Sequence, residues 1–153
     1  MMAGAYHDAL CSEHMTKRIL VPMDDSEMAQ HAFRYALEFH PDADITVMHV
    51  VGTPSSMLGS ATGLALEDDF EEAADEAAEP TFELARDIAD EYDRTVDTRV
   101  QVGHPVRAIL NAADDFDAIV LGSHSGTLAD RLFIGNVTEK IVRQSPVPVT
   151  VVR

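Results

Sequence analysis

The chain has 153 residues, with 27 acidic and 11 basic side chains and one cysteine, Cys11. This length fits one domain that buries roughly 70% of its unfolded surface, so no disulfide or metal is needed to hold a core. The formal net charge of −16 repels nucleic acids and anionic membrane surfaces, so we expect neither as a partner. The longest apolar runs are strand-sized and too short to cross a bilayer, and we expect a cytoplasmic protein.

Lysine is scarce on this acidic chain, because Lys17 and Lys140 are its only lysines. Dense hydrated carboxylates keep the proteins of salt-accumulating microbes soluble, and high salt screens the repulsion between them. The composition therefore predicts a halophilic source. The alternative is an ordinary acidic protein.

The chain begins with residues 1–14, which show no clear periodicity. We expect a flexible leader there, followed by one domain over residues 15–153. Short β-branched runs then alternate with amphipathic stretches, which is typical of βαβ units and a parallel sheet. Residues 18–23 predict the first strand. Behind it, Asp24, Asp25 and Ser26 offer oxygens that cap a helix over residues 27–39. The expected buried face of this helix comprises Ala29, Ala32, Phe33, Ala36 and Leu37.

Residues 45–51 predict a second strand, and the Gly/Ser/Thr-rich residues 52–63 predict a lid or a disordered loop. A long amphipathic helix is expected over residues 66–92, kinked or restarted at Pro80. Thirteen acids and only Arg86 among basic residues lie between Glu67 and Asp93, which indicates a solvated face rather than a cation site. The expected apolar stripe comprises Phe70, Ala74, Ala77, Ala85, Ile88 and Tyr92.

The same alternation continues to the end of the chain. We expect strands over residues 98–102, 118–122 and 147–152 and helices over residues 105–113 and 137–144. Together these elements predict an α/β fold with a single doubly wound domain. Its five-stranded parallel sheet has the order 3-2-1-4-5, with about four helices on both faces.

Ligands of an open parallel sheet bind beyond the carboxyl ends of strands where the winding direction reverses, here after strands one and four. The loop after strand four carries Gly122, Gly126 and Gly135 and leads to the N-terminus of the last helix. Backbone N–H groups there favour an anion such as phosphate, although loop glycines also serve simple turns. Asn136 and Glu139 have the spacing of a capping box, which would explain Asn136 structurally.

A set of motifs occurs in order along the chain. The motifs are Ile19-Leu-Val-Pro-Met-Asp-Asp-Ser26, Thr46-Val-Met-His-Val-Val51, Gly103-His-Pro105, Leu121-Gly-Ser-His124, Gly135-Asn-Val-Thr-Glu139 and Pro146-Val-Pro-Val149. In this order and spacing they resemble the universal stress protein family over nearly all of residues 15–153. The resemblance implies a cytosolic regulatory or protective module in stress response that binds ATP or AMP, with Mg²⁺ as an optional companion of ATP.

The family's nucleotide signature is a glycine, two residues, a glycine, nine residues, and a glycine followed by serine or threonine. Gly122 and Gly135 match it, whereas Ser125 replaces the second glycine and Asn136 replaces the hydroxyl residue. Ser125 adds a side chain where backbone should approach phosphate, and Gly126 beside it can absorb part of this change. Asn136 is the milder change, because its amide can donate to a phosphate oxygen.

The resemblance also assigns roles to individual residues. For three residues the alternative is a role without a ligand: Asp24 only caps a helix, His124 is an exposed loop residue, and His49 packs within its strand. The implied nucleotide-binding residues are Pro22, Met23 and Asp24 after strand one, Val50 at the adenine, Gly122, His124, Ser125 and Gly126 around ribose and phosphates, and Gly135, Asn136, Val137 and Thr138 at the last helix.

The final strand suggests how two chains associate. Pro146 and Pro148 lack N–H groups on one side of the strand, so we expect that side at the open edge of the sheet. In the family this edge pairs with its two-fold mate. The resemblance therefore implies a symmetric homodimer, with the prolines limiting the ladder, through Val149, Thr150, Val151 and Val152.

The sequence favours a binding module over a dedicated enzyme, because it has no Walker lysine motif and no nucleophile with an orienting base. Slow ATP hydrolysis or autophosphorylation is the most that the resemblance implies. A second hypothesis is a dimeric scaffold or small-ligand binder without nucleotide, since Ser125 and Asn136 break the signature. A third hypothesis is a phosphoacceptor receiver that holds magnesium at Asp24 and Asp25. A receiver needs a phosphorylatable aspartate after strand three, and Gly103 in that place argues against it.

Overall fold

The computed structural model describes residues 17–52, 67–123 and 135–153. Five strands in these residues form one parallel sheet in the order β3-β2-β1-β4-β5, which confirms the predicted fold and strand order. The expected leader and most of the expected lid lie outside the described residues. The strands are β1 (Arg18–Pro22), β2 (Asp44–Val51), β3 (Asp97–Val102), β4 (Ala118–Gly122) and β5 (Val149–Val152).

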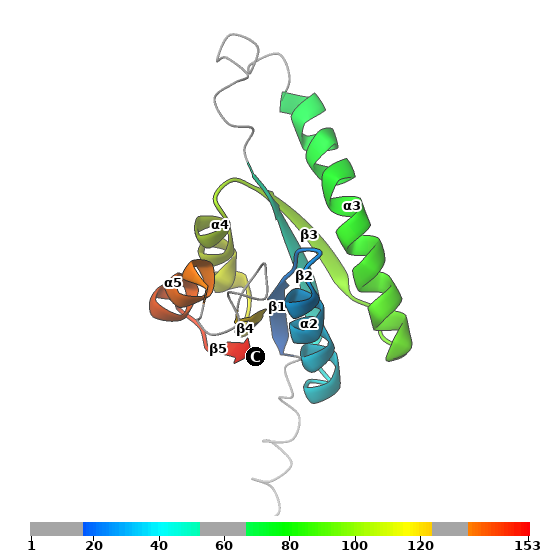
Figure 1. Cartoon of the computed structure of the whole chain (residues 1–153), viewed down its shortest axis with the longest axis vertical. Helices are drawn as coiled ribbons and strands as arrows, with labels where there is room; N and C mark the ends of the chain where they lie inside the picture. The colour runs from blue at the N-terminus through cyan, green and yellow to red at the C-terminus, as the bar shows by residue number, and fades with distance from the viewer. Residues whose placement is uncertain (1–16, 53–66, 124–134) are drawn as a thin grey trace, which may run out of the picture.

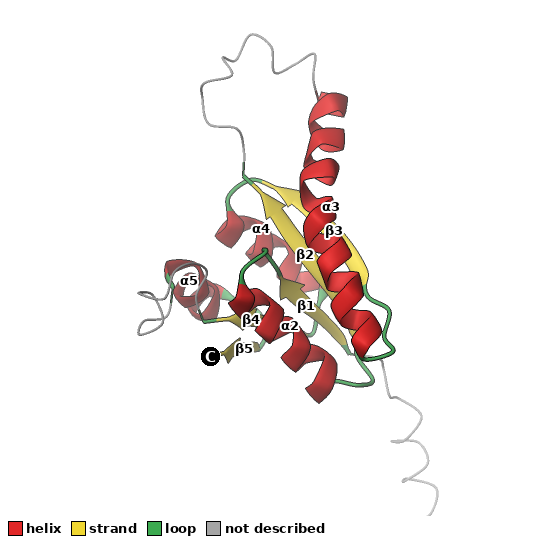
Figure 2. Cartoon of the chain, turned by 45° about the vertical axis from the view of Figure 1, so that its right-hand side comes forward, coloured by secondary structure: helices red, strands yellow, loops and turns green. Residues whose placement is uncertain are grey.

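Helices cover both faces of the sheet (Figure 1). One face carries α2 (Glu27–Phe39) and α3 (Glu67–Glu91), which Figure 2 shows in front of the strands. The other face carries α4 (Pro105–Ala112), the short 3-10 helix η2 (Ala113–Asp115) and α5 (Asn136–Gln144). No helix in the described part of the chain is both long enough and apolar enough to span a membrane.

Two hydrophobic cores lie on the two faces of the sheet, because successive strand residues point to opposite sides. Ile19 and Val21 of β1 join the core under α2 and α3. Leu20, between them, joins the core under α4 and α5. Both faces of β1 are therefore buried, as its continuous apolar run predicts.

Helix α2 follows the local sequence rules closely. The Ser26 hydroxyl accepts a hydrogen bond from the Ala29 N–H at 3.2 Å and caps the helix. All five residues of the predicted apolar face are buried. Arg34 pairs with Glu91 at 2.8 Å, which places this side of α2 against α3.

Helix α3 is one continuous helix through Pro80, so the expected restart at this proline is wrong. The expected apolar stripe is also wrong at one position, because Ala77 is exposed and Ala78 is fully buried. The buried face advances in steps of four from Ala74 to Ala78 and Phe82, whereas a step of three leads to Ala77. Both steps keep a residue on one helix face, so spacing alone did not distinguish them.

Strand β5 lies at one edge of the sheet. We expected the backbone nitrogen of Pro148, just before this strand, to point to the open edge, but the backbone of Pro148 points towards β4. Its carbonyl accepts from the Ile119 N–H of β4 at 2.9 Å, and the Val152 carbonyl accepts from Ser123 at 2.8 Å. The backbone N–H and carbonyl groups of successive strand residues point in opposite directions, so those of Val149 and Val151 point to the open edge. Pro148 is tolerated because it directly precedes the first residue of β5.

Candidate functional site

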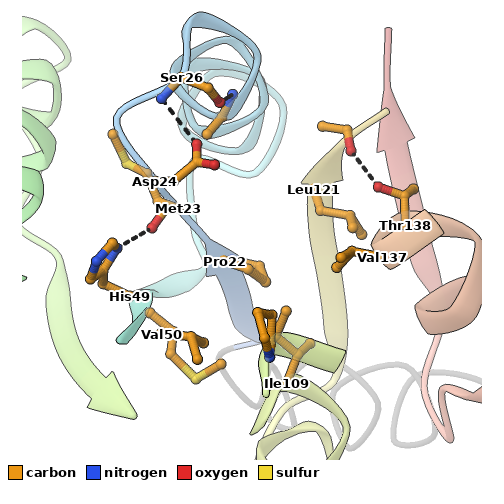
Figure 3. Close-up of a pocket in the computed structure, with 14 residues that line it drawn as sticks. Pro22, Met23, Asp24, Ser26, His49, Val50, Ile109, Leu121, Val137 and Thr138 are labelled. Carbon is orange, nitrogen blue, oxygen red and sulfur yellow. Dashed lines mark hydrogen bonds between the residues drawn. The ribbon is translucent and has the colours of Figure 1, made fainter. Parts of the chain in front are cut away.

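A cavity of about 190 Å³ opens at the carboxyl ends of β1, β2 and β4, where the strand order reverses (Figure 3). This is the point at which open α/β sheets bind ligands. Side chains from both strands and helices surround it. The lining residues are Pro22, Met23, Asp24, Ser26, Ala29, Met48, His49, Val50, Pro105, Ile109, Leu121, Gly122, Val137 and Thr138.

Seven of the predicted nucleotide-binding residues line this one cavity, from four different elements or the loops after them. They are Pro22, Met23, Asp24, Val50, Gly122, Val137 and Thr138. Gly135 and Asn136 are described but do not line it. His124, Ser125 and Gly126 lie outside the described residues.

The sequence reasoning missed the wall that α4 contributes. Pro105 and Ile109 line the cavity from the first turns of this helix. Pro105 was visible in the motif Gly103-His-Pro105, but only its place in the fold connects it with Val50. Met48 could have been predicted, because residues two apart in a strand share a face and Val50 was already predicted to bind the nucleotide. The other missed lining residues are Ser26, Ala29, His49 and Leu121.

Among the described residues, Asp24 is the only charged side chain in the lining, and it is half-buried. Its Oδ1 accepts from the Ser26 N–H at 3.0 Å, which fixes the carboxylate at the mouth of the cavity (Figure 3). Ser26, rather than Asp24, caps α2. Oδ2 has no hydrogen-bond partner among the described residues, so this oxygen is free to accept from a hydroxyl group of a ligand.

His49 links β2 to the end of β1. Its Nδ1 lies 2.9 Å from the Met23 carbonyl oxygen (Figure 3). A carbonyl oxygen only accepts, so Nδ1 must carry the proton, and in the neutral ring Nε2 is then an acceptor. The expected packed role fits this contact, yet the half-buried ring also forms part of the cavity wall.

The N-terminus of α5 is held against β4. Thr138 is 4% exposed, and its hydroxyl donates to the Gly122 carbonyl at 2.9 Å (Figure 3). The expected capping box is wrong, because Gly135 is the N-cap and Asn136 is already the first helical residue. Glu139 pairs with Arg143 at 3.0 Å instead of reaching back. Since Gly135 has no side chain, no side-chain cap occupies the first N–H groups of α5.

Gly122 matches the family signature, but its packing explains it without a ligand. A Cβ atom at this position would lie 2.5 Å from the Met28 Cγ and 3.0 Å from the Met28 carbonyl oxygen. The absence of a side chain at Gly122, which lines the cavity, therefore lets α2 approach the end of β4.

Comparisons with known proteins bear on the family and the fold. The family model described as "Universal stress protein family" matches residues 15–153. Universal stress protein MJ0531 of Methanocaldococcus jannaschii is 29% identical over 150 residues, which cover 92% of this chain and 84% of that protein. MJ0577 of the same organism is 28% identical over 155 residues, which cover 91% of this chain and 96% of that protein.

Solved structures share the fold as well. The MJ0577 structure has a TM-score of 0.71 at 27% identity and covers 90% of this chain and 96% of its own. A universal stress protein solved in complex with cAMP has a TM-score of 0.64 at 26% identity and covers 90% and 97%. With the family model spanning residues 15–153 and these relatives matching over nine-tenths of its length, the chain belongs to the universal stress protein family.

Proposed function

We propose that the chain binds an adenine nucleotide, ATP or AMP, in the cavity at the ends of β1, β2 and β4. The observation that carries the proposal is that three features meet there. They are an apolar lining, the Asp24 carboxylate with only Oδ1 bonded to a described residue, and a helix N-terminus without a side-chain cap. The relative in complex with cAMP supports the choice of an adenine nucleotide. The chain would act through binding, as a regulatory or protective module in stress response.

The base would enter the apolar part of the cavity. Val50 from β2, Pro105 and Ile109 from α4, and Pro22 from β1 line the cavity with apolar atoms. Figure 3 shows Pro22, Val50 and Ile109 on the same side of the site. Flat apolar walls bury a planar base well, and a few polar groups then fix its orientation. His49 supplies one such group, because its Nε2 can accept from an exocyclic amine.

The ribose would lie at Asp24. A carboxylate oxygen with no protein partner is a strong acceptor for sugar hydroxyl groups, and hydrogen bonds to charged groups contribute about 1.5–3 kcal/mol. The bond from the Ser26 N–H holds the carboxylate in place before the ligand arrives. Asp24 would therefore act in recognition and not as a catalytic base.

The phosphates would lie at the first turn of α5, where the helix dipole and the N–H groups favour an anion. Val137 and Thr138 line this end of the cavity. No lysine or arginine lines the cavity in the described part of the chain. We therefore propose that ATP binds as its magnesium complex, because Mg²⁺ offsets the negative charge of the phosphates, which no basic side chain of the described lining balances.

A scaffold without nucleotide is the second candidate, since Gly135 and Asn136 do not line the cavity. Mass spectrometry of small molecules released from freshly purified protein separates the two. Recovery of an adenine nucleotide supports our proposal. Absence of released nucleotide, together with no thermal shift in millimolar ATP and magnesium, would establish the scaffold instead.

We also propose that the chain forms a symmetric homodimer through the open edge of β5, involving Val149 to Val152. Val149 and Val151 direct their N–H and carbonyl groups outward, and neither is a proline, so this edge can pair with a second copy. Light scattering in molar salt tests this. A dimer mass is expected, and a monomer mass would contradict it.

A further inference from the structure

A second hollow, of about 390 Å³, lies between α4 and α5 on the outer side of the molecule. The two helices turn their other sides towards the sheet and the nucleotide cavity, so none of the residues that line one hollow lines the other. We call this hollow the donor groove. It is lined by His104, Val106, Arg107, Leu110, Asn111, Lys140 and Gln144.

The charge of the donor groove is opposite to that of the chain. Its polar side chains are two cations, two amides and an imidazole, all of which can donate hydrogen bonds, and no carboxylate of the described residues lines it. The side chains of Arg107 and Lys140 form no ion pair or hydrogen bond with the described residues. In a chain with 27 acids and 11 bases, two unpaired cations in one groove form an uncommon local concentration of positive charge.

Most other described cations are engaged by the protein itself. Arg18, Arg34, Arg86, Arg99 and Arg143 pair with carboxylates, and Arg94 donates to backbone carbonyls.

Neighbouring acids do not neutralise the donor groove. Glu139, next to Lys140 on α5, pairs with Arg143 at 3.0 Å. Asp114 and Asp115 follow α4 in the 3-10 helix, and Asp115 pairs with Arg99 at 3.1 Å. The groove therefore keeps its positive side chains free for an anionic ligand from outside.

The donors form two rows that fit a chain segment better than a compact anion. His104, Arg107 and Asn111 are spaced i, i+3 and i+7 along α4, and Lys140 and Gln144 are spaced i and i+4 on α5. The row on α4 extends for about 10 Å at 1.5 Å per residue. A single phosphate would reach only part of this row, whereas several residues of a peptide would cover it.

We propose that the donor groove binds an acidic segment of a partner protein. Carboxylates of the segment pair with Arg107 and Lys140, and its backbone accepts from the Asn111 and Gln144 amides. Half-buried Leu110 of α4, also in the lining, offers a small apolar contact. This interaction surface does not depend on the nucleotide, so each proposal can fail without the other.

Fluorescence anisotropy with a labelled peptide of about twelve residues, composed of Glu, Leu and Ala, tests the proposal on the full chain at low ionic strength. The Arg107→Gln/Lys140→Gln variant should bind about tenfold more weakly, since each exposed ion pair contributes up to about 1 kcal/mol. The matched control is Arg18→Gln/Arg86→Gln, which changes the net charge equally but leaves the groove and its neighbouring ion pairs intact. It should stay within about twofold.

Three results would overturn the proposal. One is no binding of the peptide by the wild-type chain. Another is equal weakening in both double variants, which would indicate an effect of net charge alone. The third is that inorganic pyrophosphate competes as well as an unlabelled copy of the peptide, which would assign the groove to a compact anion. All four substituted residues are exposed, and thermal denaturation should show that both variants stay folded.

Discussion

Replacing Gly122 with alanine tests the close approach of α2 to β4 at the cavity beyond the ends of β1, β2 and β4. The added Cβ would lie 2.5 Å from the Met28 Cγ, 3.0 Å from the Met28 carbonyl oxygen and 3.2 Å from its carbonyl carbon. The side-chain atom can move away, but the two backbone atoms require α2 to shift. Extra atoms in a well-packed site cost about 1–3 kcal/mol, so we expect the free energy of unfolding to fall by about 2 kcal/mol.

Urea denaturation followed by circular dichroism measures this loss, and Gly52→Ala is the matched control. A Cβ at Gly52 meets no atom of the described residues within 4 Å, so this variant should stay within about 0.5 kcal/mol of the wild type or gain slightly. A Gly122→Ala/Met28→Ala double variant should recover part of the loss through the coupling of the two sites. Equal unfolding midpoints for Gly122→Ala and Gly52→Ala would refute the reasoning.

Three further predictions concern stability, recognition and salt. Arg94→Met should lower the free energy of unfolding by about 2–3 kcal/mol, because Arg94 donates to the carbonyls of Leu37, His40 and Ala43. Arg86→Met, which breaks only an exposed pair, should cost less than about 1 kcal/mol in the same urea titration. Asp24→Asn should weaken AMP binding by about tenfold in calorimetry, whereas a similar loss in Asp25→Asn would show that charge alone matters. Raising KCl towards molar concentrations should raise the thermal midpoint, because salt screens the repulsion of a −16 chain, and an unchanged midpoint would contradict this.

The fold was predictable because its signals are local. Ser26 is a good N-cap residue followed by an apolar stripe, and α2 begins after it as expected. The β-branched runs gave four strands to within one residue of their observed bounds, while β5 begins at Val149, two residues later than expected. Helix α3 was harder, because small alanines at positions 77 and 78 fit a buried face equally well by spacing alone.

The errors at the site arise where tertiary contacts decide between local options. Asn136 can cap a helix, but the helix begins one residue earlier and Gly135 takes the cap position. The direction of Pro148 depends on the register of β5 against β4, which the sequence does not encode locally. Pro105 and Ile109 reach the cavity only because α4 packs beneath the end of β2.

Isothermal titration of the purified chain with AMP tests the central claim most directly. Our account predicts saturable binding of one nucleotide per chain, and at about 100 times the dissociation constant AMP should stabilise the fold by about 2.7 kcal/mol. No heat of binding at millimolar AMP, with an unchanged thermal midpoint, would contradict the assignment of the cavity to an adenine nucleotide.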